Sequence, residues 1–145
     1  MPHMKINIRK RIFPAYELPE GYTCIVIDCS ELTERDRYHW KRIQHQRKNV
    51  KSHDKLILPE KGAAMFVKYH GEFIGCSCLK HISPDIIESQ HAMVLPEHRR
   101  KGVFKALMGG MWRYCYFGGY TWVNLSPILQ KPWWDSLGAE KNWAT

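Results

Sequence analysis

Three basic residues directly precede a glycine at the expected start of a helix. The stretch VLPEHRRKGVFKAL, residues 94–107, places Arg99, Arg100 and Lys101 before Gly102. A helix start exposes backbone N–H groups and carries partial positive charge, so basic side chains there need either solvent or an anion. Gly102 would let a ligand approach the backbone without meeting a Cβ. These features predict a phosphate-binding loop of backbone amides with basic side chains as clamps, and the alternative is an exposed basic turn.

The wider pattern V-x-P-x-x-R-x-x-G-x-x-x-x-L, from Val94 to Leu107, resembles the acetyl-CoA-binding motif of the GCN5-related N-acetyltransferase (GNAT) family. In that family a Q/R-x-x-G-x-G/A loop between the fourth strand and the third helix wraps the CoA pyrophosphate. The resemblance implies that the cofactor-binding loop comprises Arg99, Arg100, Lys101, Gly102, Val103 and Phe104. Phe104 departs from the small residue of the family. Because it belongs to the apolar stripe of the following helix, we expect its ring to turn into the core.

Glu88 is the residue that the resemblance implies as catalytic base. It lies six residues before Val94, at the position of the catalytic Glu of histone-acetylating members, and is the only carboxylate in its expected strand. Regular strand alternation would place Glu88 on the same face as Gln90, Ala92 and Val94. The alternative is a solvated rim carboxylate without a catalytic role.

The resemblance implies two further sets of contacts to acetyl-CoA. The backbone amide of Met93 or Val94 would polarise the thioester carbonyl. Asn124 and Ser126 fall where strand residues of the family hold the pantetheine arm.

The C-terminal part departs from the family in two ways. Trp134 stands where members commonly have a Tyr as general acid, and an indole N–H does not supply a proton at neutral pH. Only AEKNWAT follows Gly138, which leaves room for one short strand where the family has a hairpin. We expect either an open acceptor site or a sheet completed by another subunit or by the N-terminal strand.

Composition narrows the class of protein. The 145 residues predict one domain, residues 1–145, and MPHM is compatible with three added residues before a natural start at Met4. Five cysteines without a CxxC pair argue against a disulfide scaffold and a zinc ribbon, so we expect no metal.

Cys76 and Cys78 are predicted to be small buried residues. The net charge of +8 favours anionic partners, although the basic run 41–55 lacks interleaved aromatics and indicates nucleic-acid binding only weakly.

Periodicity predicts the elements. Strands are expected at 5–12 (an edge strand), 23–29 (a buried strand), 63–82 (two strands around a turn at His70-Gly71), 86–95 and 120–125. Helices are expected from a capping box at Thr33 and Asp36 to about Gln46, from Gly102 to Gly118-Gly119, and briefly from Pro132 to Gly138.

The prediction is therefore an α/β protein of the GNAT fold, with a central mixed sheet flanked by helices and a shortened C-terminal end. The expected function is transfer of an acetyl group from acetyl-CoA, a co-substrate, to a primary amine on a small molecule, a protein or an RNA-linked group. The alternative is a non-catalytic GNAT-like interaction or structural protein, related to phage proteins, that retains the fold. We expect a cytoplasmic protein without membrane contact, with a homodimer as one assembly.

Overall fold

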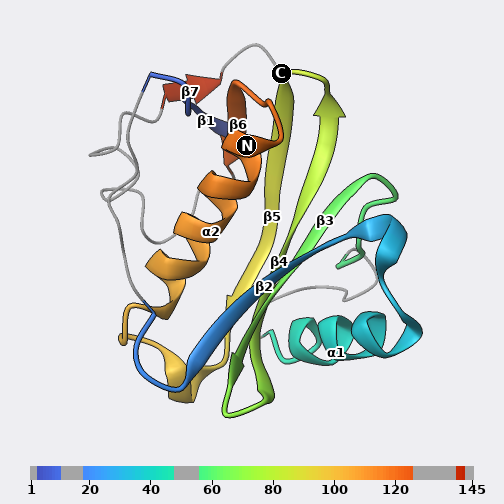
Figure 1. The fold of residues 1–145 in the computed structure, drawn as a ribbon, viewed down its shortest axis with the longest axis vertical. Helices are drawn as coiled ribbons and strands as arrows, with labels where there is room; N and C mark the ends of the chain where they lie inside the picture. Colours follow the sequence, from blue (N-terminus) through green and yellow to red (C-terminus); the bar gives the residue numbers. More distant parts are fainter. Residues whose placement is uncertain (1–2, 11–17, 48–55, 126–139, 143–145) are drawn as a thin grey trace.

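A computed structural model of the chain describes residues 3–10, 18–47, 56–125 and 140–142. The strands form one seven-stranded sheet in the order β2-β3-β4-β5-β6-β1-β7 (Figure 1). The strands are β1 (His3–Asn7), β2 (Tyr22–Asp28), β3 (Gly62–Tyr69), β4 (Glu72–Ser83), β5 (Ile86–Val94), β6 (Trp122–Leu125) and β7 (Glu140–Asn142). All neighbouring pairs are antiparallel except β5 and β6, which are parallel and joined through helix α2. The prediction of a mixed sheet with a central strand–helix–strand unit is confirmed.

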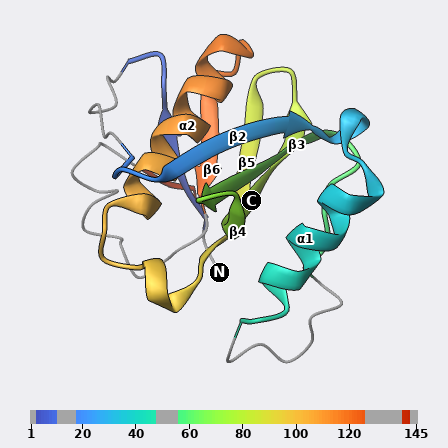
Figure 2. The ribbon, with the colours of Figure 1, turned by 60° about the horizontal axis from the view of Figure 1, so that its bottom comes forward.

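The two helices cover opposite faces of the sheet (Figure 2). Helix α2 (Val103–Phe117) packs on the face that carries Met65, Leu79, Ile87 and Val123. Helix α1 (Glu34–Gln44) packs through Trp40 and Ile43 on the other face, which carries Phe66, Cys76 and Cys78. Alternation along the strands explains this division, since neighbouring residues such as Met65 and Phe66 point to opposite faces. The reading of Cys76 and Cys78 as buried core residues is confirmed.

Local signals place the helix ends. Thr33 accepts a hydrogen bond from the Asp36 amide and Asp36 accepts one from the Thr33 amide, which is the predicted capping box. Helix α1 ends at Gln44, two residues before the prediction. Helix α2 ends before Gly118, and Gly119 takes the left-handed conformation with φ +86°. The turn at His70-Gly71 is also confirmed, with φ values of +47° and +86°.

The N-terminal strand differs from the prediction of an edge strand over 5–12. Strand β1 lies between β6 and β7, and its pairing with β6 runs from Met4 opposite Leu125 to Asn7 opposite Trp122. It stops at Asn7 because the Asn7 side chain and carbonyl accept from the Arg9 and Lys10 amides in a turn. The sequence left open how the sheet is completed, and in the structure the N-terminal strand β1 completes it. Strand β7 is the short C-terminal strand that was expected.

Strand β2 was predicted as a buried strand, and this is wrong. It forms one edge of the sheet, with β3 as its single neighbour, and Ile25 is 37% exposed. Successive side chains of this edge strand point to opposite faces of the sheet, and buried and exposed residues are therefore mixed along it. Within the described ranges, no helix is long and apolar enough to cross a membrane.

Candidate active site

The basic loop connects the end of β5 to the start of α2. It comprises a 3-10 turn, Pro96–His98, followed by residues 99–102. Arg100 has φ +63° and Gly102, the N-cap of α2, has φ +80°. A Cβ added at Gly102 would meet no atom within 4 Å, so open space adjoins the backbone at this point. This geometry agrees with the prediction that a ligand can approach the backbone closely at Gly102.

The start of α2 has the electrostatics of an anion site. The N-cap residue, Gly102, has no side chain to cap this helix end, and the first turn of the helix contains no acidic residue. The first N–H groups of any α-helix lack acceptors within the helix, and the macrodipole adds positive potential there. Arg100 and Lys101 are exposed beside it. Their charges add to the helix dipole, so the loop is suited to a pyrophosphate group.

The side chains at the start of α2 point inward. Val103 is 1% exposed, and Phe104 is half-buried against the core between α2 and the sheet. The expectation that the Phe104 ring turns into the core is confirmed. Only the backbone of these two residues is therefore placed toward the loop.

A bulge in β5 changes which residues share a face. Cys76 pairs with Met93 and Cys78 pairs with Gln90, so β5 has one more residue than β4 between these two pairs. His91 lies at the bulge and has φ +58°. Ala92 and Val94 consequently pack on the α2 face, whereas Gln90 lies opposite Cys78 on the α1 face. The prediction that Glu88 shares the face of Val94 is wrong, because the bulge reverses the alternation.

The described pairing of β5 with β6 covers the first half of β5. Their pairing runs from Ile86 opposite Trp122 to Ser89 opposite Leu125, so the described part of β6 accompanies only the first half of β5 (Figure 1). The Leu95 amide donates to the Ile74 carbonyl of β4 at 2.9 Å. Alternation in an antiparallel ladder then turns the backbone of Met93 toward β4 and that of Val94 away from it. Of the two amides predicted to polarise a thioester, that of Val94 points away from β4, toward the side of β5 on which β6 lies.

Arg99 bridges the loop and β5. Its Nε donates to the Val94 carbonyl at 2.8 Å, and its Nη2 lies 3.8 Å from Met93 Sδ. The guanidinium thus holds the loop against the strand end as well as adding positive charge there. A charged donor on a backbone carbonyl is a comparatively strong hydrogen bond.

Glu88 lies in a row of polar residues on the α1 face. It stands directly opposite Lys80 of β4 and Asn124 of β6, and Asn124 stands opposite Lys5 of β1. Glu88 is half-buried and accepts a hydrogen bond from Gln90 Nε2. A carboxylate with basic and amide neighbours is placed to take a proton from a group on this face.

A buried polar network holds the bulge from the α1 side. Gln44 is fully buried, and its Nε2 donates to the His91 carbonyl at 2.6 Å. Arg47 donates through Nε to Gln44 Oε1 at 2.8 Å and through Nη2 to the Ala92 carbonyl at 2.6 Å. Burial, followed by the charge of Arg47, lowers the pKa of His91. The imidazole of His91 is therefore mainly neutral at pH 7.

Several predicted features fall outside the described residues. These are Ser126, Trp134 and the short helix from Pro132 to Gly138. Among the described tyrosines, Tyr120 has its hydroxyl 2.6 Å from His81 Nδ1. Burial raises the pKa of Tyr120, and likewise that of Tyr114. Among the described residues no group of His, Cys, Asp or Glu is arranged to hold a metal ion.

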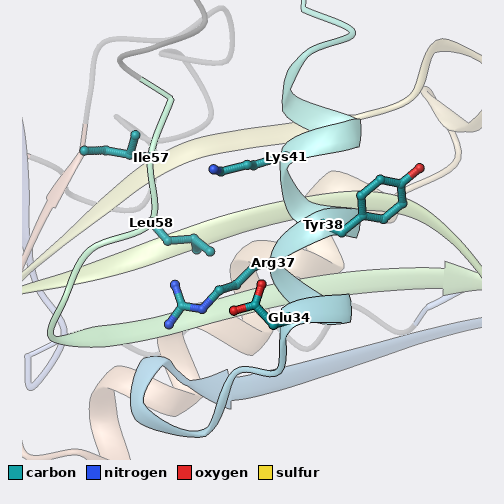
Figure 3. Close-up of a pocket in the computed structure, with 6 residues that line it drawn as sticks. All are labelled: Glu34, Arg37, Tyr38, Lys41, Ile57 and Leu58. Atoms are coloured by element: carbon teal, nitrogen blue, oxygen red, sulfur yellow. The ribbon is translucent and has the colours of Figure 1, made fainter.

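A cavity of about 370 Å³ opens between α1 and residues 57–58 (Figure 3). Arg37 and Glu34 point from the helix toward Leu58, and Lys41 lies one turn further along. Tyr38 and Ile57 are 62% and 60% exposed at its rim. None of the residues predicted from the sequence for the site lines this cavity, which lies on the same face of the sheet as Glu88.

Comparisons with known proteins identify the class. Residues 25–122, more than half of the chain, match the acetyltransferase (GNAT) family model. The chain therefore belongs to the GNAT acetyltransferase family, and the predicted fold is confirmed. A search of curated proteins finds no significant match.

Solved structures share this fold at low sequence identity. A GCN5-related N-acetyltransferase from Kribbella flavida superposes with a TM-score of 0.68 at 19% identity, over 97% of this chain and 54% of the other. A GNAT family acetyltransferase from Elizabethkingia anophelis, determined with acetyl-CoA bound, gives 0.59 at 15% identity over 82% and 73%. Escherichia coli ElaA gives 0.63 at 13% identity over 81% and 86%. The chain spans only about half the length of the first structures it matches.

The structure adds residues that sequence reasoning missed. Gln44 and Arg47 reach the bulge, and Tyr22 contacts the basic loop through His98. Gln44 has a weak sequence signal, because it extends the buried stripe of Trp40 and Ile43 at helical spacing. Tyr22 has none, since 76 positions separate it from His98.

Proposed function

We propose that this protein transfers an acetyl group from acetyl-CoA, a co-substrate, to a primary amine. The observation that carries the proposal is the basic loop at the start of α2, where open space adjoins the Gly102 backbone and the Val94 amide at the end of β5 points away from β4. The Val94 amide, which points away from β4, can bind a thioester oxygen, and the helix start offers positive potential to a pyrophosphate. Membership of the GNAT family and a relative determined with acetyl-CoA bound support the same reading.

Each proposed binding role uses a group already in place. The backbone from Gly102 to Phe104, with Arg100 and Lys101, would hold the pyrophosphate, and Arg99 would keep the loop on the strand end. Asn124, beside Glu88 on β6, is placed on the α1 face for the pantetheine arm or the acceptor.

The proposed chemistry separates donor and base across the sheet. The amine nitrogen attacks the thioester carbon, and the Val94 N–H stabilises the developing oxyanion. The C–S bond then breaks with CoA leaving as thiolate, and the proton still on the nitrogen passes to that thiolate or to solvent. Glu88 takes the ammonium proton beforehand, directly or through water. Because Glu88 lies on the α1 face and the start of α2 on the other, the acceptor would approach from the α1 side.

The nature of the acceptor follows from the same face. The cavity beside α1 is flanked by exposed Tyr38 and Ile57 and by both signs of charge. Arg37, Lys41 and the net charge of +8 disfavour a compact polycationic metabolite, so we infer an acceptor on a macromolecule. All five cysteines are free thiols, which fits a reducing compartment such as the cytoplasm.

Two measurements test the proposal. Calorimetry should detect binding of acetyl-CoA to the wild-type protein, and thiol release on a panel of amines and amine-bearing peptides should detect turnover. Glu88→Gln should lower kcat by about 10²-fold or more with acetyl-CoA binding retained. Glu72→Gln, at the exposed start of β4, is the matched control and should leave kcat unchanged.

The outcomes separate the candidate functions. Absence of acetyl-CoA binding would refute the cofactor site. Full activity of Glu88→Gln would remove Glu88 as the base. Binding without turnover on every acceptor would favour a non-catalytic interaction protein that retains the fold.

A further inference from the structure

A tyrosine on the edge strand contacts His98, the last residue of the 3-10 turn in the basic loop. The Tyr22 hydroxyl lies 2.6 Å from His98 Nδ1, and the two rings meet edge to face with centroids 5.5 Å apart. Tyr22 is only 8% exposed. Tyr69, opposite Tyr22 on β3, places its ring 4.6 Å from Tyr22 and 5.2 Å from His98. The His98 ring is thus held by one hydrogen bond and two aromatic contacts.

The loop needs such an anchor because part of its backbone is intrinsically unfavourable. Arg100 has φ +63°, a conformation that residues with a Cβ rarely adopt, and Gly102 follows at φ +80°. A residue keeps such an unfavourable backbone conformation when contacts with the surrounding structure hold it there. Arg99 fastens the loop to the Val94 carbonyl, and His98 fastens the preceding turn to β2. Both attachments come directly before Arg100.

We propose that Tyr22 and His98 are positioning residues that hold residues 99–102 in the conformation that binds the pyrophosphate of CoA. The inference rests on the proposed function, because it assigns these residues to the same cofactor site. A loop that is already ordered loses less conformational entropy when it binds its ligand. Removal of the hydrogen bond therefore weakens the part of donor binding that depends on the pyrophosphate, and leaves the acyl-transfer step unchanged.

The test compares two acetyl donors in the full-length protein. Acetyl-CoA carries the pyrophosphate, whereas S-acetylpantetheine presents the same thioester without it. Tyr22→Phe keeps the buried ring and removes only the hydroxyl. We expect the Kd for acetyl-CoA, measured by calorimetry, to rise about three- to tenfold, as the loss of one neutral hydrogen bond implies. We expect kcat to change less than twofold and kcat/KM for S-acetylpantetheine to stay unchanged.

Two further variants control for general damage to the fold. Tyr69→Phe removes a hydroxyl from the same aromatic cluster for which no hydrogen bond is found among the described residues, and should bind acetyl-CoA as the wild type does. His98→Gln, whose amide can still bond the Tyr22 hydroxyl, should retain more acetyl-CoA affinity than His98→Leu. A merely structural role would not produce dependence on the pyrophosphate or this partial rescue.

The failures are distinguishable. If the wild type binds acetyl-CoA and Tyr22→Phe binds it equally well, the positioning role is wrong and the proposed function stands. Equal losses with acetyl-CoA and S-acetylpantetheine also overturn the positioning role. If the wild type itself does not bind acetyl-CoA, the proposed function and the role of Tyr22 fail together.

Discussion

Replacement of Gln44 by Met tests whether a buried amide holds the bulge of β5. Gln44 is fully buried, and its amide joins the His91 carbonyl at 2.6 Å, Cys76 Sγ at 3.2 Å and Arg47 Nε at 2.8 Å. Methionine has a similar unbranched shape and fills the same space. The substitution therefore removes the polar partners with little change of packing.

The expected cost follows from the groups that lose Gln44. The His91 carbonyl and Arg47 Nε–H would each lose a partner in a largely buried region. A buried donor or acceptor without its partner costs about 1–3 kcal/mol, so we expect a loss of about 2–5 kcal/mol in the free energy of unfolding. For a chain of this size that corresponds to a fall in Tm of about 5–15 °C. The loss is a large share of the stability of a typical domain.

Urea unfolding measures this loss directly, with Gln46→Met as the matched control. Gln46 lies two residues further along the chain, is exposed, and has its amide 3.5 Å from the Arg42 carbonyl. Its substitution should change the unfolding free energy by no more than about 0.5 kcal/mol. If Gln44→Met shifts the urea midpoint no more than Gln46→Met does, the reasoning about the network is refuted. Where turnover is measurable, Gln44→Met should lower kcat more than it raises KM, because the bulge sets the position of the Val94 amide.

Three further predictions concern stability. Arg9 donates to the Tyr116 and Tyr120 carbonyls at 2.6 and 2.9 Å, so Arg9→Ala should lower the unfolding free energy by about 1 kcal/mol, and an unchanged urea midpoint would contradict this role. Gly62→Ala should cost about 3 kcal/mol or more, because its Cβ would lie 1.8 Å from the Leu79 carbonyl oxygen, whereas Gly71→Ala, with open space and φ +86°, should cost about 1 kcal/mol. Equal urea midpoints for the two glycine variants would refute the steric argument. Burial raises the pKa of three thiols above its ordinary value of 9.0, to about 11 for Cys24 and about 12 for Cys76 and Cys115. Because the unfolded chain loses these protons first, the contribution of these thiols to stability should be constant well below pH 9 and fall as the pH rises toward 12; a flat urea midpoint between pH 9 and 11 would contradict it.

The sequence by itself determined the features that depend on near neighbours in the chain. The capping box at Thr33, the His70-Gly71 turn and the apolar stripe of α2 follow from spacings of a few residues, and the structure confirms each. The basic loop belongs to the same group, because a glycine and three cations before a helix have a local physical meaning. The family resemblance also rested on this stretch, and the comparisons confirm the family.

Only the tertiary structure decided which groups meet across the chain. Periodicity identified a strand at the N-terminus. Its place in the sheet, between β6 and β7, is set by pairing with strands from the other end of the chain. The face of Glu88 was predicted wrongly because alternation counts residues along one strand and cannot register a bulge. The bulge at His91 and Ala92 accepts hydrogen bonds from Gln44 and Arg47, which lie at least 45 positions earlier in the chain. The contact between Tyr22 and His98 likewise forms only when the edge strand β2 and the end of β5 fold into one sheet. Contacts of this kind need chain segments to pack together, and no short-range pattern encodes them.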